Sequence, residues 1–166
     1  MEINKFYIAG KFITPDGKEI IDLINPATEE KVGHVVSGSV KDVNDAVSAA
    51  KKAFQDASAL SLEQKKTILQ EIIDGMDERR EEFAQVISEE MGAPIKVARG
   101  AQFSSGKVHF VNTLKVIDSF SFSEVHDNIT LNKLPIGPVG MITPWNWPLN
   151  QMCTNCLLYT SPSPRD

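Results

Sequence analysis

Helical hydrophobic spacing repeats four times between residues 39 and 117, and this run limits the fold more than any other feature of the chain. The first helix is predicted to begin at Ser39, because Ser39 and Asp42 have the spacing of a capping box. The third is predicted to end at Gly92, and the fourth to span about Ile95 to Ile117. Each helix has one apolar face, which another layer of structure has to cover.

Short strands are predicted in the first 36 residues, ahead of the helices. Phe6–Ile8 and Lys11–Ile13 are expected to pair as a hairpin, with Gly10 supplying the positive φ of a tight turn. Glu19–Ile24 is rich in β-branched residues and is predicted as a further strand, as is Lys31–Val36. The sequence thus predicts a β-ribbon that precedes the helices.

A second ribbon is predicted after the helices, where the hydrophobic period becomes two. Phe120 and Phe122 alternate with serines, and Ile129 and Leu131 alternate with polar residues after a turn at residues 126–128. A single half-exposed hairpin is marginally stable in water. It is therefore expected to pack on its own domain or to extend a sheet in another subunit.

The composition is typical of one domain of a cytoplasmic protein. The chain has 166 residues, of which 42% are hydrophobic, and a net charge of -5 that repels phosphate backbones and anionic lipids. No nucleic-acid or membrane partner is expected. The two cysteines cannot form a disulfide framework, and the first residues lack the pattern of a secretory signal. His34, His109 and His126 are too scattered to suggest metal ligands, so no metal site is expected.

The segment from Val139 to Leu149 carries the residues that could take part in binding or catalysis. Residues 139–143 are predicted to be a buried strand, and Pro144 and Pro148 restrict the backbone on either side of Trp145-Asn146-Trp147. Ligands bind α/β sheets at such strand ends, where the amide of Asn146 could donate to an oxygen that becomes negative. The residues alone also allow another interpretation, in which Asn146 caps a helix beginning at Trp147-Pro148 and both Trp side chains belong to the core.

A family resemblance rests on this segment. Leu134–Gly140 followed by Ile142–Gln151 resembles the signature segment of the NAD(P)-dependent aldehyde dehydrogenases. Further similarity, in family order, lies in Ile8–Phe12, Asn25–Glu29, Ala46–Phe54 and Glu89–Pro94, so that about residues 5 to 152 are covered. The resemblance implies an α/β protein: the truncated N-terminal part of that fold, with a β-ribbon, helices, the start of a Rossmann-like parallel sheet and an oligomerisation hairpin.

The resemblance also implies roles for individual residues. Asn146 would be the oxyanion donor that stabilises the thiohemiacetal formed when a Cys thiolate attacks an aldehyde, on the way to a thioester and a carboxylic acid. Ile142, Thr143, Pro144 and Trp145, with Asn146, would line the cleft for the cofactor, NAD or NADP. The full-length protein would be a homo-oligomer, a dimer or a tetramer, acting on a small aldehyde.

The expected organisation has four parts. Residues 1–117 would begin the NAD(P)-binding domain, 118–135 would be the oligomerisation hairpin, and 136–152 would return to the first domain. Residues 153–166 resemble nothing in the family and are predicted to be a tail that is not native. The family's nucleophilic Cys and general-base Glu lie far beyond this point, so the chain by itself is expected to be inactive.

Two other functions remain open at this stage. The chain could be a non-catalytic interaction module that docks on full-length subunits through its helices and the hairpin. Cys153 and Cys156 also have the C-x-x-C spacing of redox proteins, although no second pair of ligands or thioredoxin-like βαβ context accompanies them.

Overall fold

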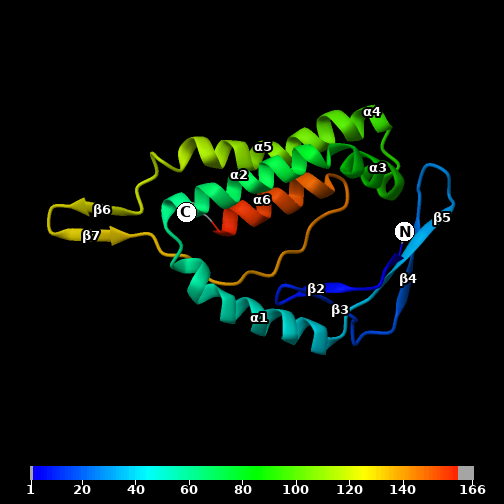
Figure 1. Ribbon diagram of the computed structural model, residues 1–166, viewed down its shortest axis with the longest axis horizontal. Coiled ribbons are helices and arrows are strands. Elements are labelled where there is room, and N and C mark those ends of the chain that lie inside the picture. The colour runs from blue at the N-terminus through cyan, green and yellow to red at the C-terminus, as the bar shows by residue number, and fades with distance from the viewer. Residues whose placement is uncertain (1, 161–166) are drawn as a thin grey trace.

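A computed structural model describes residues 2–160, and it arranges them as a helical layer beside a smaller β-rich part (Figure 1). The strands are β1 (Glu2–Ile3), β2 (Phe6–Ile8), β3 (Lys11–Ile13), β4 (Ile20–Ile24), β5 (Lys31–Val36), β6 (Ser123–His126) and β7 (Ile129–Asn132). The helices are α1 (Val40–Ser58), α2 (Leu62–Glu78), α3 (Arg80–Met91), α4 (Ile95–Val97), the π-helix η1 (Ala98–Gln102), α5 (Phe103–Val116) and α6 (Pro148–Thr160).

The predicted β-ribbon is confirmed. β2 and β3 pair antiparallel around Ala9 and Gly10, whose φ angles are 53° and 77°, and β4 pairs antiparallel with β5. The short strand β1, which has no local sequence signal, adds to β5 in parallel. The described strands form three small sheets, with the orders β1-β5-β4, β2-β3 and β6-β7.

The predicted helix ends are also confirmed. Capping boxes close the N-termini of α1 and α2, where the Ser39 and Ser61 side chains accept hydrogen bonds from backbone N–H groups. α3 ends at Gly92, which has a left-handed φ of 71°. A Cβ at Gly92 would lie 2.9 Å from Cγ of Pro26, so this helix end touches the loop between β4 and β5.

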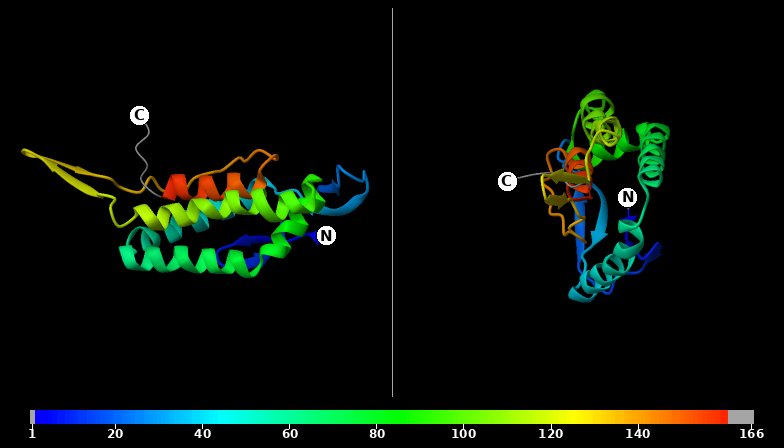
Figure 2. Two further views of the ribbon diagram at one scale, coloured as in Figure 1. Left: turned by 90° about the horizontal axis from the view of Figure 1, so that it is seen from above. Right: turned by 90° about the vertical axis from the view of Figure 1, so that its left-hand side faces the viewer.

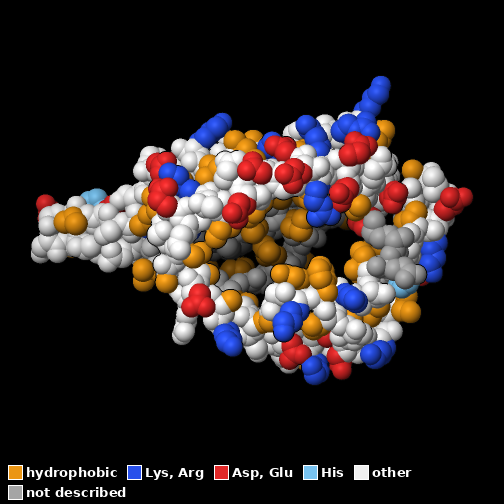
Figure 3. Space-filling view, in the orientation of Figure 1, with side chains coloured by type: hydrophobic (Ala, Val, Ile, Leu, Met, Phe, Trp, Pro, Cys, Tyr) orange, Lys and Arg blue, Asp and Glu red, His pale blue; other side chains and the backbone are white. Residues whose placement is uncertain are grey.

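The core lies among α2, α3, α5 and α6 rather than under a sheet. Buried apolar side chains from these elements and from η1 form one cluster, in which Phe103 is almost fully enclosed. α1 lies apart from the helical layer, and Val43 and Val47 on it are exposed. Hydrophobic side chains gather around the hollow between α1 and the helical layer (Figure 3). Apolar surface of the described residues thus remains without a partner.

The prediction of a strand at residues 139–143 is wrong. These residues are irregular and carry no strand pairing, and Val139 and Met141 are exposed. A strand needs a neighbouring strand to pair its backbone groups, and residues 139–143 belong to none of the three described sheets. Among the described residues, the one parallel pairing joins β1 to β5.

The C-terminal part is more helical than its proline content suggested. α6 begins at Pro148, because proline fits the first position of a helix, where its missing N–H costs no hydrogen bond. Cys153 and Leu157 on α6 are buried in the helical core. The predicted tail thus continues α6 as far as Thr160, and residues 161–166 lie outside the described residues. Among residues 2–160, no helix combines the length and apolar character that crossing a membrane requires.

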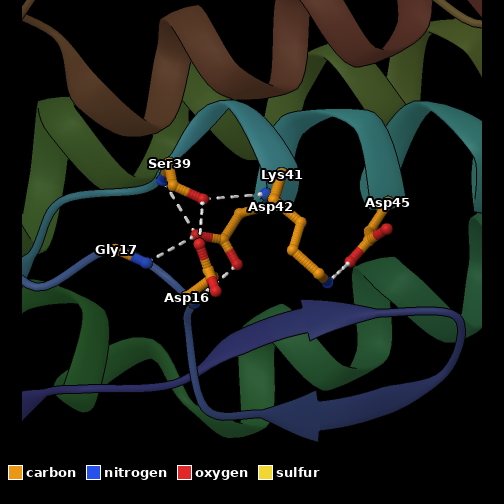
Figure 4. A network of polar contacts seen from close by, with 6 residues as sticks. All are labelled: Asp16, Gly17, Ser39, Lys41, Asp42 and Asp45. Atoms are coloured by element: carbon orange, nitrogen blue, oxygen red, sulfur yellow. Dashed lines mark hydrogen bonds and ion pairs between the residues drawn. The ribbon is translucent and has the colours of Figure 1, made fainter.

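A buried carboxylate fastens the β3–β4 turn to α1 (Figure 4). The Asp42 carboxylate accepts hydrogen bonds from the backbone N–H groups of Asp16 at 2.8 Å, Gly17 at 3.0 Å and Ser39 at 2.8 Å. The Ser39 hydroxyl donates to the carboxylate of Asp16 at 3.0 Å. The N–H donors of Asp16 and then Ser39 hold the pKa of Asp42 well below its usual range.

This network makes the stability of the chain depend on pH. A carboxyl group whose pKa is lowered by folding stabilises the protein above its unfolded pKa of about 3.9, and that contribution is lost as the pH falls through the lower folded value. We expect Asp42→Asn to lower the thermal midpoint at pH 7, and the difference from the unsubstituted chain to shrink below about pH 4. Thermal unfolding followed by circular dichroism across this range measures it. Asp45→Asn, which removes only a surface partner of Lys41, is the control; an equal loss in both variants would contradict the prediction.

Candidate active site

The site predicted from the sequence lies on one exposed segment between β7 and α6. This segment crosses the open side of the molecule between α1 and α6 before it turns into α6 (Figure 1). Ile142 is 99% exposed and Trp145 79% exposed, and Thr143, Pro144 and Asn146 are exposed as well. The structure therefore brings the five predicted site residues together as consecutive, accessible positions.

The N-terminal turn of α6 fixes the end of this segment. The N–H of Gln151 donates to the carbonyl of Trp147 at 2.9 Å, and Pro148 is the first helical residue. A helix thus starts where the alternative interpretation of Asn146 places it. The same interpretation assigned both Trp side chains to the core, which is wrong, since Trp147 is 37% exposed and Trp145 more so.

The backbone of Asn146 is held from the helical layer. Gln102, at the end of η1, donates from Nε2 to the backbone carbonyl of Asn146 at 3.4 Å. This contact holds the backbone carbonyl of Asn146, although Asn146 as a whole is exposed. An exposed amide on an anchored backbone can donate a hydrogen bond to a bound carbonyl oxygen.

Two residues near this turn were missed from the sequence. Gln102 is only 3% exposed, and His109 is half-buried. Nε2 of His109 lies 2.7 Å from Oδ1 of Asn150 and 2.7 Å from the hydroxyl of Thr154, so α5 and α6 share a polar contact. The only sequence signal for this pair is that Gln102 and His109 are seven residues apart, a spacing that places both on one face of a helix.

The two cysteines occupy α6. Burial raises the pKa of the Cys153 thiol to about 11 and also raises the pKa of Cys156. Reactive redox cysteines need a lowered pKa, because the thiolate is the nucleophile. The pKa shifts of both thiols are thus opposite in direction to those of reactive redox cysteines.

An open surface cleft of about 570 Å³ lies elsewhere, beside α2, α3 and η1. Its charged lining is balanced, with three acidic and three basic side chains: Asp77, Glu78, Glu81, Arg80, Lys96 and Arg99. The Arg99 guanidinium already donates to both carboxylate oxygens of Glu81, at 2.6 and 2.7 Å. None of the predicted site residues lines this cleft. Within residues 2–160, no group of three or more His, Cys, Asp or Glu side chains could hold a metal ion.

Known proteins with similar sequences share this architecture. The chain is 36% identical over 152 residues to a 3-succinoylsemialdehyde-pyridine dehydrogenase of a Pseudomonas species, an alignment that covers 91% of this chain and 32% of that enzyme. A crystal structure of an aldehyde dehydrogenase from Bartonella henselae superposes with a TM-score of 0.88 at 38% identity, covering 92% of this chain and 33% of that one. A Pseudomonas syringae aldehyde dehydrogenase, crystallised with NAD+ and octanal, also gives a TM-score of 0.88, at 41% identity over 90% of this chain and 31% of its own.

The chain thus spans about a third of the length of these relatives. The model of the aldehyde dehydrogenase family matches residues 12–158, which is most of the sequence and reaches six residues past the predicted boundary at 152. From the match of the family model, the sequence identities and the superpositions, the chain belongs to the aldehyde dehydrogenase family.

Proposed function

We propose that this chain supplies the first third of an enzyme that oxidises an aldehyde to a carboxylic acid with NAD+ or NADP+. The observation that carries this proposal is the exposed segment from Ile142 to Asn146, anchored at the start of α6 in a chain of this family. The similar Pseudomonas syringae enzyme with NAD+ and octanal bound supports both the cofactor and the substrate class.

The exposed segment fits one wall of a dinucleotide site. Ile142, Pro144 and Trp145 present apolar surface, and the backbone from residue 142 to 144 is not used in a strand. Cofactor sites combine such apolar walls with a few polar groups that fix orientation. When bound, the cofactor supplies the acceptor for the hydride that leaves the aldehyde carbon. Ile142, Thr143, Pro144, Trp145 and Asn146 would hold its nicotinamide side.

The chemical role of Asn146 follows from the charge that develops on the substrate. When a cysteine thiolate forms a C–S bond with the aldehyde carbon, the π electron pair of the carbonyl moves to oxygen. The side-chain N–H of Asn146 would donate a hydrogen bond to that oxygen and stabilise its negative charge. The nucleophile and the general base would come from the part of the enzyme that follows this chain, so the 166-residue chain by itself would not turn over.

A chimera tests this function directly. The first third of the Pseudomonas 3-succinoylsemialdehyde-pyridine dehydrogenase is replaced by residues 1–152 of this chain, and NADH formation is measured with a panel of aldehydes that includes octanal. We expect aldehyde-dependent NADH formation by the chimera and none by the 166-residue chain alone. A folded chimera without this activity, or turnover by the isolated chain, would overturn the proposal.

We further propose that β6 and β7 join an oligomerisation sheet. The hairpin projects away from the rest of the molecule in both Figure 1 and Figure 2. Val125 is 71% exposed and Ile129 66% exposed, although both are apolar. An exposed apolar ribbon with free edges is a template for pairing with another chain. The same surface would serve an interaction module that docks on full-length subunits.

Charging the hairpin is expected to break that association. With Val125→Lys and Ile129→Lys together, the chimera should shift from an oligomer to a single subunit, because the charges would lose their hydration in the interface. Light scattering coupled to size-exclusion chromatography gives the mass. Gln85→Lys on the exposed face of α3 is the control. If the double variant kept the mass of the unsubstituted chimera, the hairpin would not be the interface.

A further inference from the structure

We propose that Gln102 is a positioning residue that holds Asn146 in place for the chemistry described above. The inference rests on the proposed function for its catalytic meaning, whereas its structural half concerns this chain alone. Gln102 comes from η1 and Asn146 from the turn before α6, 44 residues later, and the contact joins the two.

Gln102 is a polar residue in an apolar place. It is 3% exposed, and its Nε2 donates to the carbonyl of Asn146 at 3.4 Å and to Sδ of Met91 at 3.8 Å. Its Oε1 is buried and has no hydrogen-bond partner among the described residues. A buried acceptor without a partner lowers the stability of a protein. Packing alone therefore does not explain an amide at this position. The hydrogen bond from its NH2 group to the Asn146 carbonyl does.

The π-helical turn delivers Gln102 to this place. η1 spans Ala98 to Gln102, and both of its end residues are buried, as is Phe103 directly after it. A π-helical turn holds more residues than an α-helical one and changes which side chains face the neighbouring element. The wider turn thus places a polar side chain beside the apolar contact between α5 and α6, at the end nearest the exposed segment.

Gln102 is the first of three residues on one face that contact the start of α6. Gln102 bonds to Asn146, and His109 bonds to Asn150. Between them, Gly106 lies so close to Leu149 that a Cβ on Gly106 would be 2.6 Å from Cγ of Leu149. These contacts follow the same order along both elements. The first turn of α6 is therefore fixed by packing and by His109, and Gln102 extends the contact to Asn146, two residues before the helix.

Methionine separates the positioning role from a packing role. Gln102→Met keeps the length of the side chain and removes both the donor to Asn146 and the unpartnered acceptor. A residue that served only packing and stability would lose thermal stability when its hydrogen bonds are removed. A positioning residue predicts the opposite: an unchanged or higher thermal midpoint, together with a more mobile turn at residues 145–147.

Tryptophan fluorescence, excited at a wavelength that the tyrosines do not absorb, reports on this turn alone, because the two tryptophans of the chain are Trp145 and Trp147. For Gln102→Met in the 166-residue chain we expect lower fluorescence anisotropy and stronger quenching by acrylamide, with no loss of thermal midpoint. Gln85→Met, at an exposed glutamine of α3, is the matched control and should change neither the anisotropy nor the quenching. Unchanged anisotropy and quenching, or a lower midpoint, would overturn the proposal.

A second variant isolates the donor itself. Gln102→Glu keeps the shape of the side chain; measured at alkaline pH, where the introduced carboxyl group is ionised and cannot donate, it should loosen the two tryptophans in the same way. Wild-type anisotropy in the Glu variant would also overturn the proposal. In the chimera, Gln102→Met should lower kcat by about tenfold to a hundredfold with little change in KM, because misplacing a catalytic group costs rate more than binding. An inactive parent chimera would count against the proposed function, while the fluorescence would still decide the positioning.

Discussion

Replacing Asn146 by Ala is expected to lower kcat of the chimera by about 100- to 1,000-fold, with little change in KM. An oxyanion donor stabilises a charge that exists only after the nucleophile has attacked, so its loss affects the rate of the chemical step more than substrate binding. The backbone of Asn146 is held by Gln102 and by the start of α6, so truncating its side chain should leave the turn in place. The loss would then report on the amide alone.

Steady-state kinetics with one aldehyde at several concentrations separates kcat from KM. Asn44→Ala, at an exposed asparagine of α1, is the matched control and should keep the activity of the unsubstituted chimera. If Asn146→Ala retained kcat within a few-fold, or lost activity only through a raised KM, the oxyanion role would be wrong.

Gly106→Ala is expected to destabilise the chain even though alanine favours a helix. The added Cβ would lie 2.6 Å from Cγ of Leu149 and 3.2 Å from its backbone carbonyl carbon, which no rotation of the Leu149 side chain can relieve. Overpacking of this kind costs about 1–3 kcal/mol, which exceeds the gain of about 1 kcal/mol or less from helix propensity. We also expect α5 and α6 to move apart, which would loosen the core that both helices share.

The same substitution at a second glycine, Gly75→Ala, is expected to raise the stability of the chain instead of lowering it. Gly75 lies within α2, and a Cβ there would meet nothing within 4 Å, so the thermal midpoint should rise by about 2–4 °C. Thermal unfolding of the two variants side by side measures the contrast. A stabilised Gly106→Ala chain would mean that α6 is not packed against α5 as the structure has it.

Local signals predicted most of the secondary structure of this chain. Ser39, Ser61 and Gly92 mark helix ends because each satisfies backbone groups within a few residues of itself. The first hairpin was predictable for the same reason. β1 and the irregular segment at residues 139–143 were not, because pairing depends on which strand edges lie nearby in space, and local composition does not encode that.

In the candidate site, too, some residues could be predicted from the sequence and others could not. The resemblance placed Ile142 to Asn146 together, and their adjacency in sequence made this simple. Gln102 and His109 could not be assigned, because their partners Asn146 and Asn150 are more than forty residues away and become neighbours only when α6 packs on α5. The burial of Gln102 also depends on η1, and the sequence predicted an uninterrupted helix there.

The contact of Gly92 with the loop before β5 links two segments of family resemblance that are far apart in the chain. Pro26 and Ala27 fill the space that a side chain at Gly92 would need, at 2.9 Å from Pro26 Cγ and 3.2 Å from the Ala27 nitrogen. The two segments therefore pack directly on each other, and this contact fixes the position of the β4–β5 loop relative to the end of α3. A change on either side would be felt on the other, so that this pair of segments should tolerate substitution jointly rather than one at a time.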